Sequence, residues 1–102
     1  MKSDELISRV KGKVQAIDPG AKVILFGSRA RGDQNPSSDW DFLILSSKKT
    51  TPQFKREIRN SLIDTELESE QVISTIIFPL DTWQDYRITP LFQSIQKGGH
   101  EV

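Results

Sequence analysis

Hydrophobic residues recur at helical spacing near the start of the chain, where Ser3 or Asp4 can cap the helix that this spacing predicts. The apolar face of this helix comprises Leu6, Ile7, Val10, Val14 and Ile17. The sequence Asp-Pro-Gly at residues 18–20 favours a turn and should end the helix. An apolar run over residues 21–26 then predicts a short strand that is buried on both faces.

A second strand is predicted over residues 39–45, where apolar residues follow two closely spaced aspartates. Side chains alternate along a strand, so Asp39 and Asp41 should point from the same face. That face also carries Leu43 and Leu45, and the opposite face carries Trp40, Phe42 and Ile44. Between the two strands, residues 27–32 predict a turn that leads into a short helix, and residues 33–38 a polar loop.

The second half of the chain predicts a longer helix, a third strand and two short helices. Thr51 followed by Pro52 is typical of a helix start. The buried stripe of the helix that follows comprises Phe54, Ile58, Leu62 and Ile63. Residues 72–78 return to strand character, residues 81–86 predict a capped helical turn, and residues 90–97 predict a last short helix.

The last helix should end at Gly98-Gly99, which leaves His100 in a tail. The order of helices and strands predicts a single α/β domain that spans residues 1–102. Its central sheet should be mixed, with three strands or slightly more, and flanked by helices.

Composition and charge exclude several classes of protein. The chain has 102 residues, of which 35% are hydrophobic and 27% charged, as is usual for a globular domain. Fourteen basic residues balance fourteen acidic ones, so no general binding to nucleic acid or to a membrane is expected. The lack of cysteine excludes disulfides and thiolate metal sites. The apolar runs are too short for a signal peptide or a membrane span, so a cytoplasmic location is predicted.

The segment that joins the first two strands indicates chemistry. Gly27-Ser28 follows the first strand, and a small-residue turn in that place can bring backbone N–H groups close to a phosphate. Asp39 and Asp41 set two carboxylates side by side, which are difficult to keep ionised without a cation between them. Arg29 and Arg31 can donate charge-assisted hydrogen bonds to phosphate oxygens. Together these residues indicate a site for a nucleoside triphosphate and its divalent metal, Mg²⁺.

Each of these residues also has a simpler structural explanation. Gly27-Ser28 alone is an ordinary turn, and the two aspartates alone could form the solvated face of an edge strand. Arg29 and Arg31 could be surface residues of a short helix. Trp40 is better explained as a core residue than as a platform for a nucleobase, because it points away from the carboxylates. Only the combination of turn, spacing and carboxylate strand favours a nucleotide site.

The sequence LFGSRARG at residues 25–32, followed by SDWDFLIL at residues 38–45, resembles the signature of minimal nucleotidyltransferases of the DNA polymerase β superfamily. The resemblance implies a nucleotidyltransferase-like fold that transfers a nucleoside monophosphate, AMP from Mg-ATP, to a hydroxyl of a partner protein. It implies nucleotide-binding residues Gly27, Ser28, Arg29 and Arg31 and metal ligands Asp39 and Asp41. Members of this size often occur beside a HEPN-domain protein as toxin–antitoxin pairs, in which the nucleotidyltransferase is the antitoxin.

The sequence departs from this family in one respect, because active members generally carry a third carboxylate on a neighbouring strand. Residues 71–78 contain no acid, and Ser74 or a neighbour stands where the carboxylate is expected. Glu70 directly precedes that strand and is the first candidate for a third catalytic residue, ahead of Glu66 and Glu68 at the end of the preceding helix. Nucleotide binding is therefore better supported than turnover.

Three interpretations remain open at this point. The chain is an antitoxin-like nucleotidyltransferase, a catalytically weak or inactive nucleotide-binding module that sequesters a HEPN-type partner, or a soluble α/β domain with an unrelated role. It is too short for a separate acceptor-recognition domain. Either another polypeptide is therefore the acceptor, or a second copy of the chain completes the site as a homo-oligomer.

Overall fold

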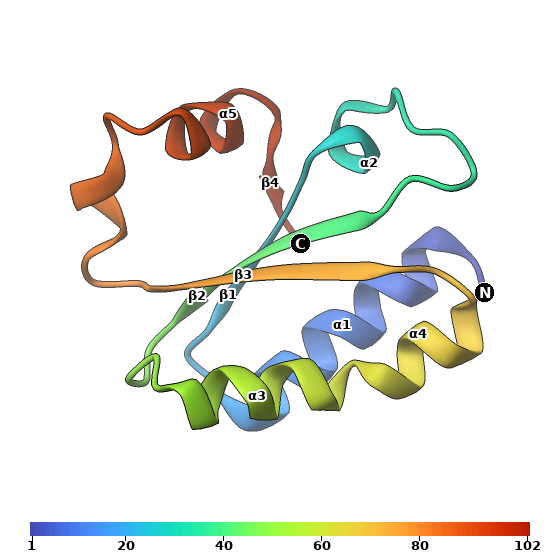
Figure 1. The fold of residues 1–102 in the computed structure, drawn as a ribbon, viewed down its shortest axis with the longest axis horizontal. Coiled ribbons are helices and arrows are strands. Elements are labelled where there is room, and N and C mark those ends of the chain that lie inside the picture. Colours follow the sequence, from blue (N-terminus) through green and yellow to red (C-terminus); the bar gives the residue numbers. More distant parts are fainter.

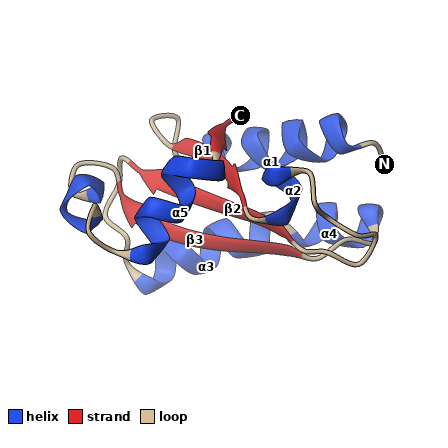
Figure 2. Ribbon diagram, turned by 90° about the horizontal axis from the view of Figure 1, so that it is seen from above, coloured by secondary structure: helices blue, strands red, loops and turns tan.

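The computed structural model describes residues 1–102 as one sheet with helices on both of its faces (Figure 1). The helices of one face are α1 (Ser3–Ile17), α3 (Pro52–Ser61) and α4 (Ile63–Ser69). The other face carries α2 (Ser28–Arg31), the 3₁₀ helix η1 (Trp83–Tyr86) and α5 (Pro90–Gly98), which crosses the strands in Figure 2. This layering confirms the predicted α/β class. None of the helices is both long and apolar enough to span a lipid bilayer.

The sheet contains four strands in the order β3-β2-β1-β4. Their bounds are Lys22–Phe26 for β1, Trp40–Ser46 for β2, Ile73–Pro79 for β3 and His100–Glu101 for β4. Strand β1 pairs antiparallel with β2 and β4, and β3 pairs parallel with β2, so the sheet is mixed as predicted. Strand β2 is paired on both sides, and all of its residues except Asp41 are buried.

Alternation along β2 divides the core into two clusters, as its sequence predicts. Trp40, Phe42 and Ile44 pack with the apolar stripes of α1 and α3 on one side of the sheet. Leu43 and Leu45 pack on the other side with Trp83, Phe92 and Ile95. The rings of Trp83 and Phe92 lie 4.9 Å apart between centroids, so the C-terminal helices are fixed on the sheet by aromatic packing.

Strand β4 is the element that the sequence did not predict. His100 does not lie in a free tail but pairs with Leu25, and the N–H of Val102 donates to the carbonyl of Val23. Gly99 passes close to α5, where a Cβ would lie 2.8 Å from the carbonyl oxygen of Ile95. A strand of two residues is too short to show an alternating pattern, so periodicity along the chain does not predict it.

The start of α1 also differs from the prediction. The helix begins at Ser3 after Lys2, and no side chain accepts a hydrogen bond at this cap. Neither Ser3 nor Asp4 therefore caps the helix. The predicted cap of α3 is confirmed, because the hydroxyl of Thr51 accepts a hydrogen bond from the N–H of Phe54 at 3.1 Å.

The long helix predicted after Thr51 is divided into α3 and α4 at Leu62. The N–H of Leu62 donates to the carbonyls of Arg59 and Asn60, which tightens the last turn of α3 and ends its regular hydrogen bonding. Leu62 remains in the core, but Ile63 is 46% exposed and does not belong to the buried stripe.

A buried carboxylate ties the turn after α1 to the end of β2. Asp18 is fully buried, and its Oδ2 accepts hydrogen bonds from the hydroxyl of Ser46 at 3.1 Å and the N–H of Ser47 at 2.9 Å. Its Oδ1 accepts from the hydroxyl of Ser47 and from the N–H of Gly20 at 3.2 Å. Burial alone would raise the pKa of this carboxyl, but the four hydrogen bonds outweigh burial and lower the pKa of Asp18.

Replacing Asp18 by alanine is expected to lower the free energy of unfolding by about 3 kcal/mol at pH 7, because three residues lose a charged acceptor. The folded-state pKa of Asp18 is lowered, so its stabilisation is present above the unfolded pKa of about 3.9 and is lost as pH falls through the folded value. Urea unfolding of wild type and variant from pH 7 to pH 2 measures this. A difference that does not shrink at low pH would contradict the assignment.

Candidate functional site

The turn between β1 and α2 places backbone directly against a carboxylate. Gly27 has a φ of +77°, a conformation that favours glycine. A Cβ on Gly27 would also lie 2.3 Å from Oδ2 of Asp41, so the position has no room for a side chain. Ser28 begins α2, where the first N–H groups have no acceptor within the helix. The turn can therefore present N–H groups and the Ser28 hydroxyl beside Asp41.

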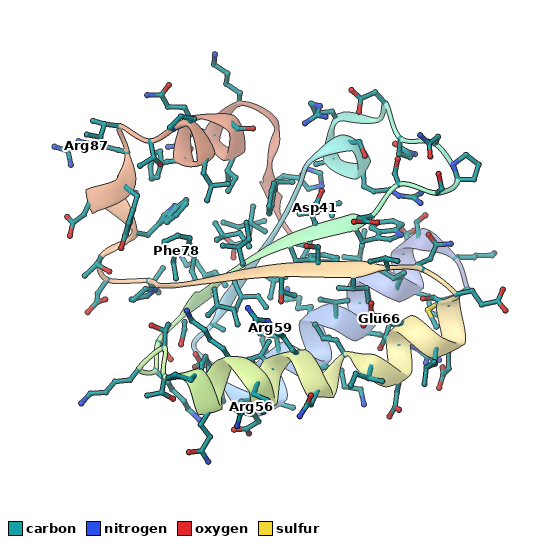
Figure 3. All side chains as sticks on the ribbon, in the orientation of Figure 1. Asp41, Arg56, Arg59, Glu66, Phe78 and Arg87 are labelled. Carbon is teal, nitrogen blue, oxygen red and sulfur yellow. The ribbon has the colours of Figure 1, made fainter.

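Asp41 is the second residue of β2, whereas Asp39 directly precedes the strand, which begins one residue later than predicted. The two carboxylates still lie close enough to repel each other. The pKa of Asp41 is raised, first by burial and then by repulsion from the Asp39 carboxylate, while the charge of Arg31 opposes the shift. Figure 3 shows Asp41 on the side of the sheet that carries α2 and α5. Two carboxylates that repel each other form a donor set that a divalent cation stabilises.

A cleft between α2 and α5 brings two cationic side chains to one place. It has a volume of about 470 Å³ and is lined by Ala30, Arg31, Ser94, Lys97 and Gly98. A Cβ on Gly98 would lie 3.2 Å from Cγ of Arg31, so this glycine allows α5 to approach α2 closely. Sequence reasoning gave Lys97 no role, because no local motif marks it and only the fold brings α5 to α2.

Arg29 makes contacts that the sequence did not predict. Its guanidinium carbon lies 4.6 Å from the centre of the Trp40 ring. Its Nη2 donates to the carbonyl of Ser38 at 3.0 Å and to Oε1 of Gln71 at 3.1 Å, and its Nε donates to the same carbonyl at 3.3 Å. The side chain is thus used within the protein, whereas Arg31 is exposed, with Asp33 as its hydrogen-bond acceptor at 3.3 Å. Trp40 is buried, which confirms it as a core residue.

Glu70, the first candidate for a third catalytic carboxylate, does not join the two aspartates. The structure gathers no group of three or more acidic, histidine or cysteine side chains that could hold a metal ion. Glu70 is exposed at the end of α4, with a φ of +57°. The parallel register of β2 and β3 instead places Ser74 beside Asp41, as the sequence indicated.

The two other acids near the end of α4 are engaged elsewhere. Oε2 of Glu66 accepts a hydrogen bond from the N–H of Ile73 at 3.0 Å, and Glu68 forms an ion pair with Arg9 of α1. Figure 3 shows Glu66 on the α4 side of the sheet, opposite to Asp41. Neither acid supplies the missing carboxylate in this arrangement.

The chain is similar to known proteins over most of its length. Residues 7–97 match the family described as "Nucleotidyltransferase domain". The chain is 38% identical over 76 residues to "Putative protein adenylyltransferase MJ0141" of Methanocaldococcus jannaschii, a match that covers 72% of this chain and 77% of that protein. A solved structure described as "Crystal structure of the toxin-antitoxin with AMP-PNP" contains a similar fold, with a TM-score of 0.66 and 18% identity. That match covers 98% of this chain and 72% of the other.

Proposed function

Since this chain belongs to the nucleotidyltransferase-domain family, we propose that it transfers AMP from Mg-ATP to a hydroxyl of a partner protein. The observation that carries the proposal is the contact between the Gly27 turn and Asp41. It sets the backbone that would face the phosphates directly beside the carboxylate that would hold the metal. The relative from Methanocaldococcus jannaschii is described as a protein adenylyltransferase. This description supports AMP as the transferred group and a protein as the acceptor.

The donor set fits Mg²⁺, which prefers one or two carboxylates and takes its other ligands from phosphate oxygens and water. Asp39 and Asp41 would hold the ion, and their mutual repulsion in its absence is what a cation would relieve. When bound, the ion neutralises phosphate charge and aligns the attacking and leaving oxygens.

The residues around the carboxylates would bind and orient the triphosphate. Ser28 offers its hydroxyl and its N–H to the outer phosphate oxygens. Arg31 and Lys97 line the neighbouring cleft and would balance negative charge on its open side. These contacts supply position and charge, which are the main needs of nucleotidyl transfer.

We propose further that residues 1–102 act as one minimal nucleotidyltransferase domain with an antitoxin-like role toward a HEPN-domain partner. The fold shared with a chain of the toxin–antitoxin structure supports this role. The position of Ser74 beside Asp41 favours a second candidate function, because a site with two carboxylates can hold Mg-ATP without activating an acceptor. In that case the chain would bind nucleotide and sequester its partner.

Isothermal titration with ATP, with and without Mg²⁺, tests the binding step common to both functions. Label transfer from α-labelled ATP to the HEPN-domain protein encoded nearest to this chain then separates them, with γ-labelled ATP as the control for phosphoryl transfer. We expect ATP binding to require Mg²⁺ and only the α-label to reach the partner. Binding that ignores Mg²⁺ would remove both functions, and binding without transfer would leave the sequestering module.

Ser28→Ala should weaken ATP binding about 10- to 150-fold, the equivalent of a charge-assisted hydrogen bond of roughly 1.5–3 kcal/mol, and weaken AMP binding much less. The difference arises because the proposed contact is to the outer phosphates. Titration of both nucleotides measures it, with Ser8→Ala on the exposed side of α1 as the matched control. Equal losses for AMP and ATP would place Ser28 elsewhere in the site.

A further inference from the structure

Asp39 stands just outside the sheet and is held in place through its two neighbours in the chain. It is exposed and precedes Trp40, the first residue of β2. On one side of it, the N–H of Trp40 donates to the carbonyl of Val72 at 2.9 Å. On the other side, the carbonyl of Ser38 accepts two hydrogen bonds from Arg29. The orientation of the Asp39 carboxylate therefore depends on how Ser38 and Trp40 are fixed.

Arg29 fixes both of these neighbours at once. Its guanidinium binds the Ser38 carbonyl through two nitrogens and lies over the Trp40 ring. It also donates to Gln71, which lies close to the start of β3. Arg29 has no ion-pair partner among the residues of the chain. The planar guanidinium of Arg29 therefore serves to position Ser38 and Trp40. An arginine suits this role because it carries several hydrogen-bond donors at fixed angles.

The loop before Asp39 transmits this constraint as a unit. The hydroxyl of Ser38 accepts a hydrogen bond from the N–H of Asn35 at 3.0 Å, and Oδ1 of Asn35 accepts one from the N–H of Ser37 at 2.9 Å. These hydrogen bonds tie Ser38 to the residues that precede it in the loop. Holding Ser38 therefore holds the whole approach to Asp39.

We propose that Arg29 is a positioning residue that turns Asp39 toward Asp41 and the Gly27-Ser28 turn. This inference rests on the proposed function, because Asp39 is taken to hold the metal. Arg29 directly follows Ser28 in α2, so one short helix sets both the phosphate-facing turn and the first carboxylate. The contacts of Arg29 with Ser38 and Trp40 thus act as a clamp on Asp39. Gln71 supports this clamp from the side of β3, because it accepts a hydrogen bond from Arg29.

Mn²⁺ is the probe for this role, because its binding can be followed by electron paramagnetic resonance without any transfer reaction. Loss of a partner that orients a metal ligand typically weakens metal binding 10- to 100-fold. We expect Arg29→Gln to weaken Mn²⁺ binding by this factor. Arg29→Lys should restore part of it, because lysine keeps a cation over Trp40 but lacks the fork. Arg9→Gln, an exposed arginine on α1, is the matched control and should leave Mn²⁺ binding unchanged.

Gln71→Ala serves as a milder variant in case Arg29→Gln does not fold. It should weaken Mn²⁺ binding less than Arg29→Gln does, and it should add nothing in the Arg29→Gln background, since Gln71 acts through Arg29. Urea unfolding of each variant shows whether the change is one of stability alone. Lower stability with unchanged Mn²⁺ binding would overturn the proposal and leave Arg29 as packing for Trp40. A loss of ATP binding with unchanged Mn²⁺ binding would also overturn it, because Arg29 would then contact phosphate.

Amide hydrogen exchange separates the failure of this inference from the failure of the proposed function. Without metal, the amide of Trp40, which donates to the carbonyl of Val72, should exchange at least tenfold faster in Arg29→Gln than in wild type, because the clamp on the loop is released. Unchanged exchange would overturn the clamp whatever the metal result. Wild type that binds no Mn²⁺ even in the presence of ATP would remove the proposed function and the metal-orienting role, even if exchange at Trp40 did depend on Arg29.

Discussion

Replacing Asp41 by asparagine is expected to stabilise the metal-free protein while it removes Mg²⁺-dependent ATP binding. Burial and repulsion from Asp39 raise the pKa of Asp41 in the folded state. Between the usual aspartate pKa of about 3.9 and the raised pKa of Asp41, the folded state therefore binds more protons than the unfolded state. In that window stability falls as pH rises, and the loss persists at pH 7. Asparagine keeps the shape of the side chain without the charge.

Urea unfolding without metal at pH 7 should show Asp41→Asn to be more stable than wild type. The difference should shrink below the ordinary aspartate pKa of about 3.9, where both states are protonated. ATP binding in Mg²⁺ should weaken by at least the 10- to 100-fold that loss of an orienting partner causes. Asp64→Asn, an exposed carboxylate on α4, is the control for loss of a charge. If Asp41→Asn is less stable than wild type and still binds Mg-ATP, the proposed metal site would be wrong. The two aspartates would then be only the solvated face of a strand.

The parts of this molecule that the sequence predicted are those that local periodicity determines. The two faces of β2 follow from alternation, so the sequence alone places Asp41 and Leu43 on one side and Phe42 on the other, as the structure does. The Gly27 turn is marked by its position between an apolar strand and a helix, and its left-handed φ agrees with the residue type.

The parts that the sequence did not predict depend on contacts between distant segments. The partners of Arg29 come from the polar loop and from Gln71, and nothing in the spacing of the chain indicates that its fork turns toward Ser38. Lys97 reaches the cleft only because Gly98 lets α5 approach α2. Glu70 is close to β3 in sequence, but the parallel register pairs Ser74 rather than Glu70 with Asp41.

That register gives a direct experiment on the missing carboxylate. Ser74 is exposed, pairs with Asp41 across β2 and β3, and points from the same face of the sheet. Ser74→Asp should therefore place a third carboxylate next to the other two. We expect it to tighten Mn²⁺ binding on the order of tenfold, because affinity for hard cations rises with the number of charged ligands. Transfer of the α-label to the partner should rise with it, because the acceptor hydroxyl gains a base.

The matched control for this gain is Thr75→Asp, which adds the same charge one residue later and on the opposite face of β3. It should change neither Mn²⁺ binding nor transfer. Ser74→Asp should also lower the stability of the metal-free protein at pH 7, since a third carboxylate adds to the repulsion that already raises the pKa of Asp41. If Ser74→Asp changes neither metal binding nor transfer while Glu70→Gln abolishes transfer in wild type, the third acid comes from the end of α4. The argument from strand register would then be wrong.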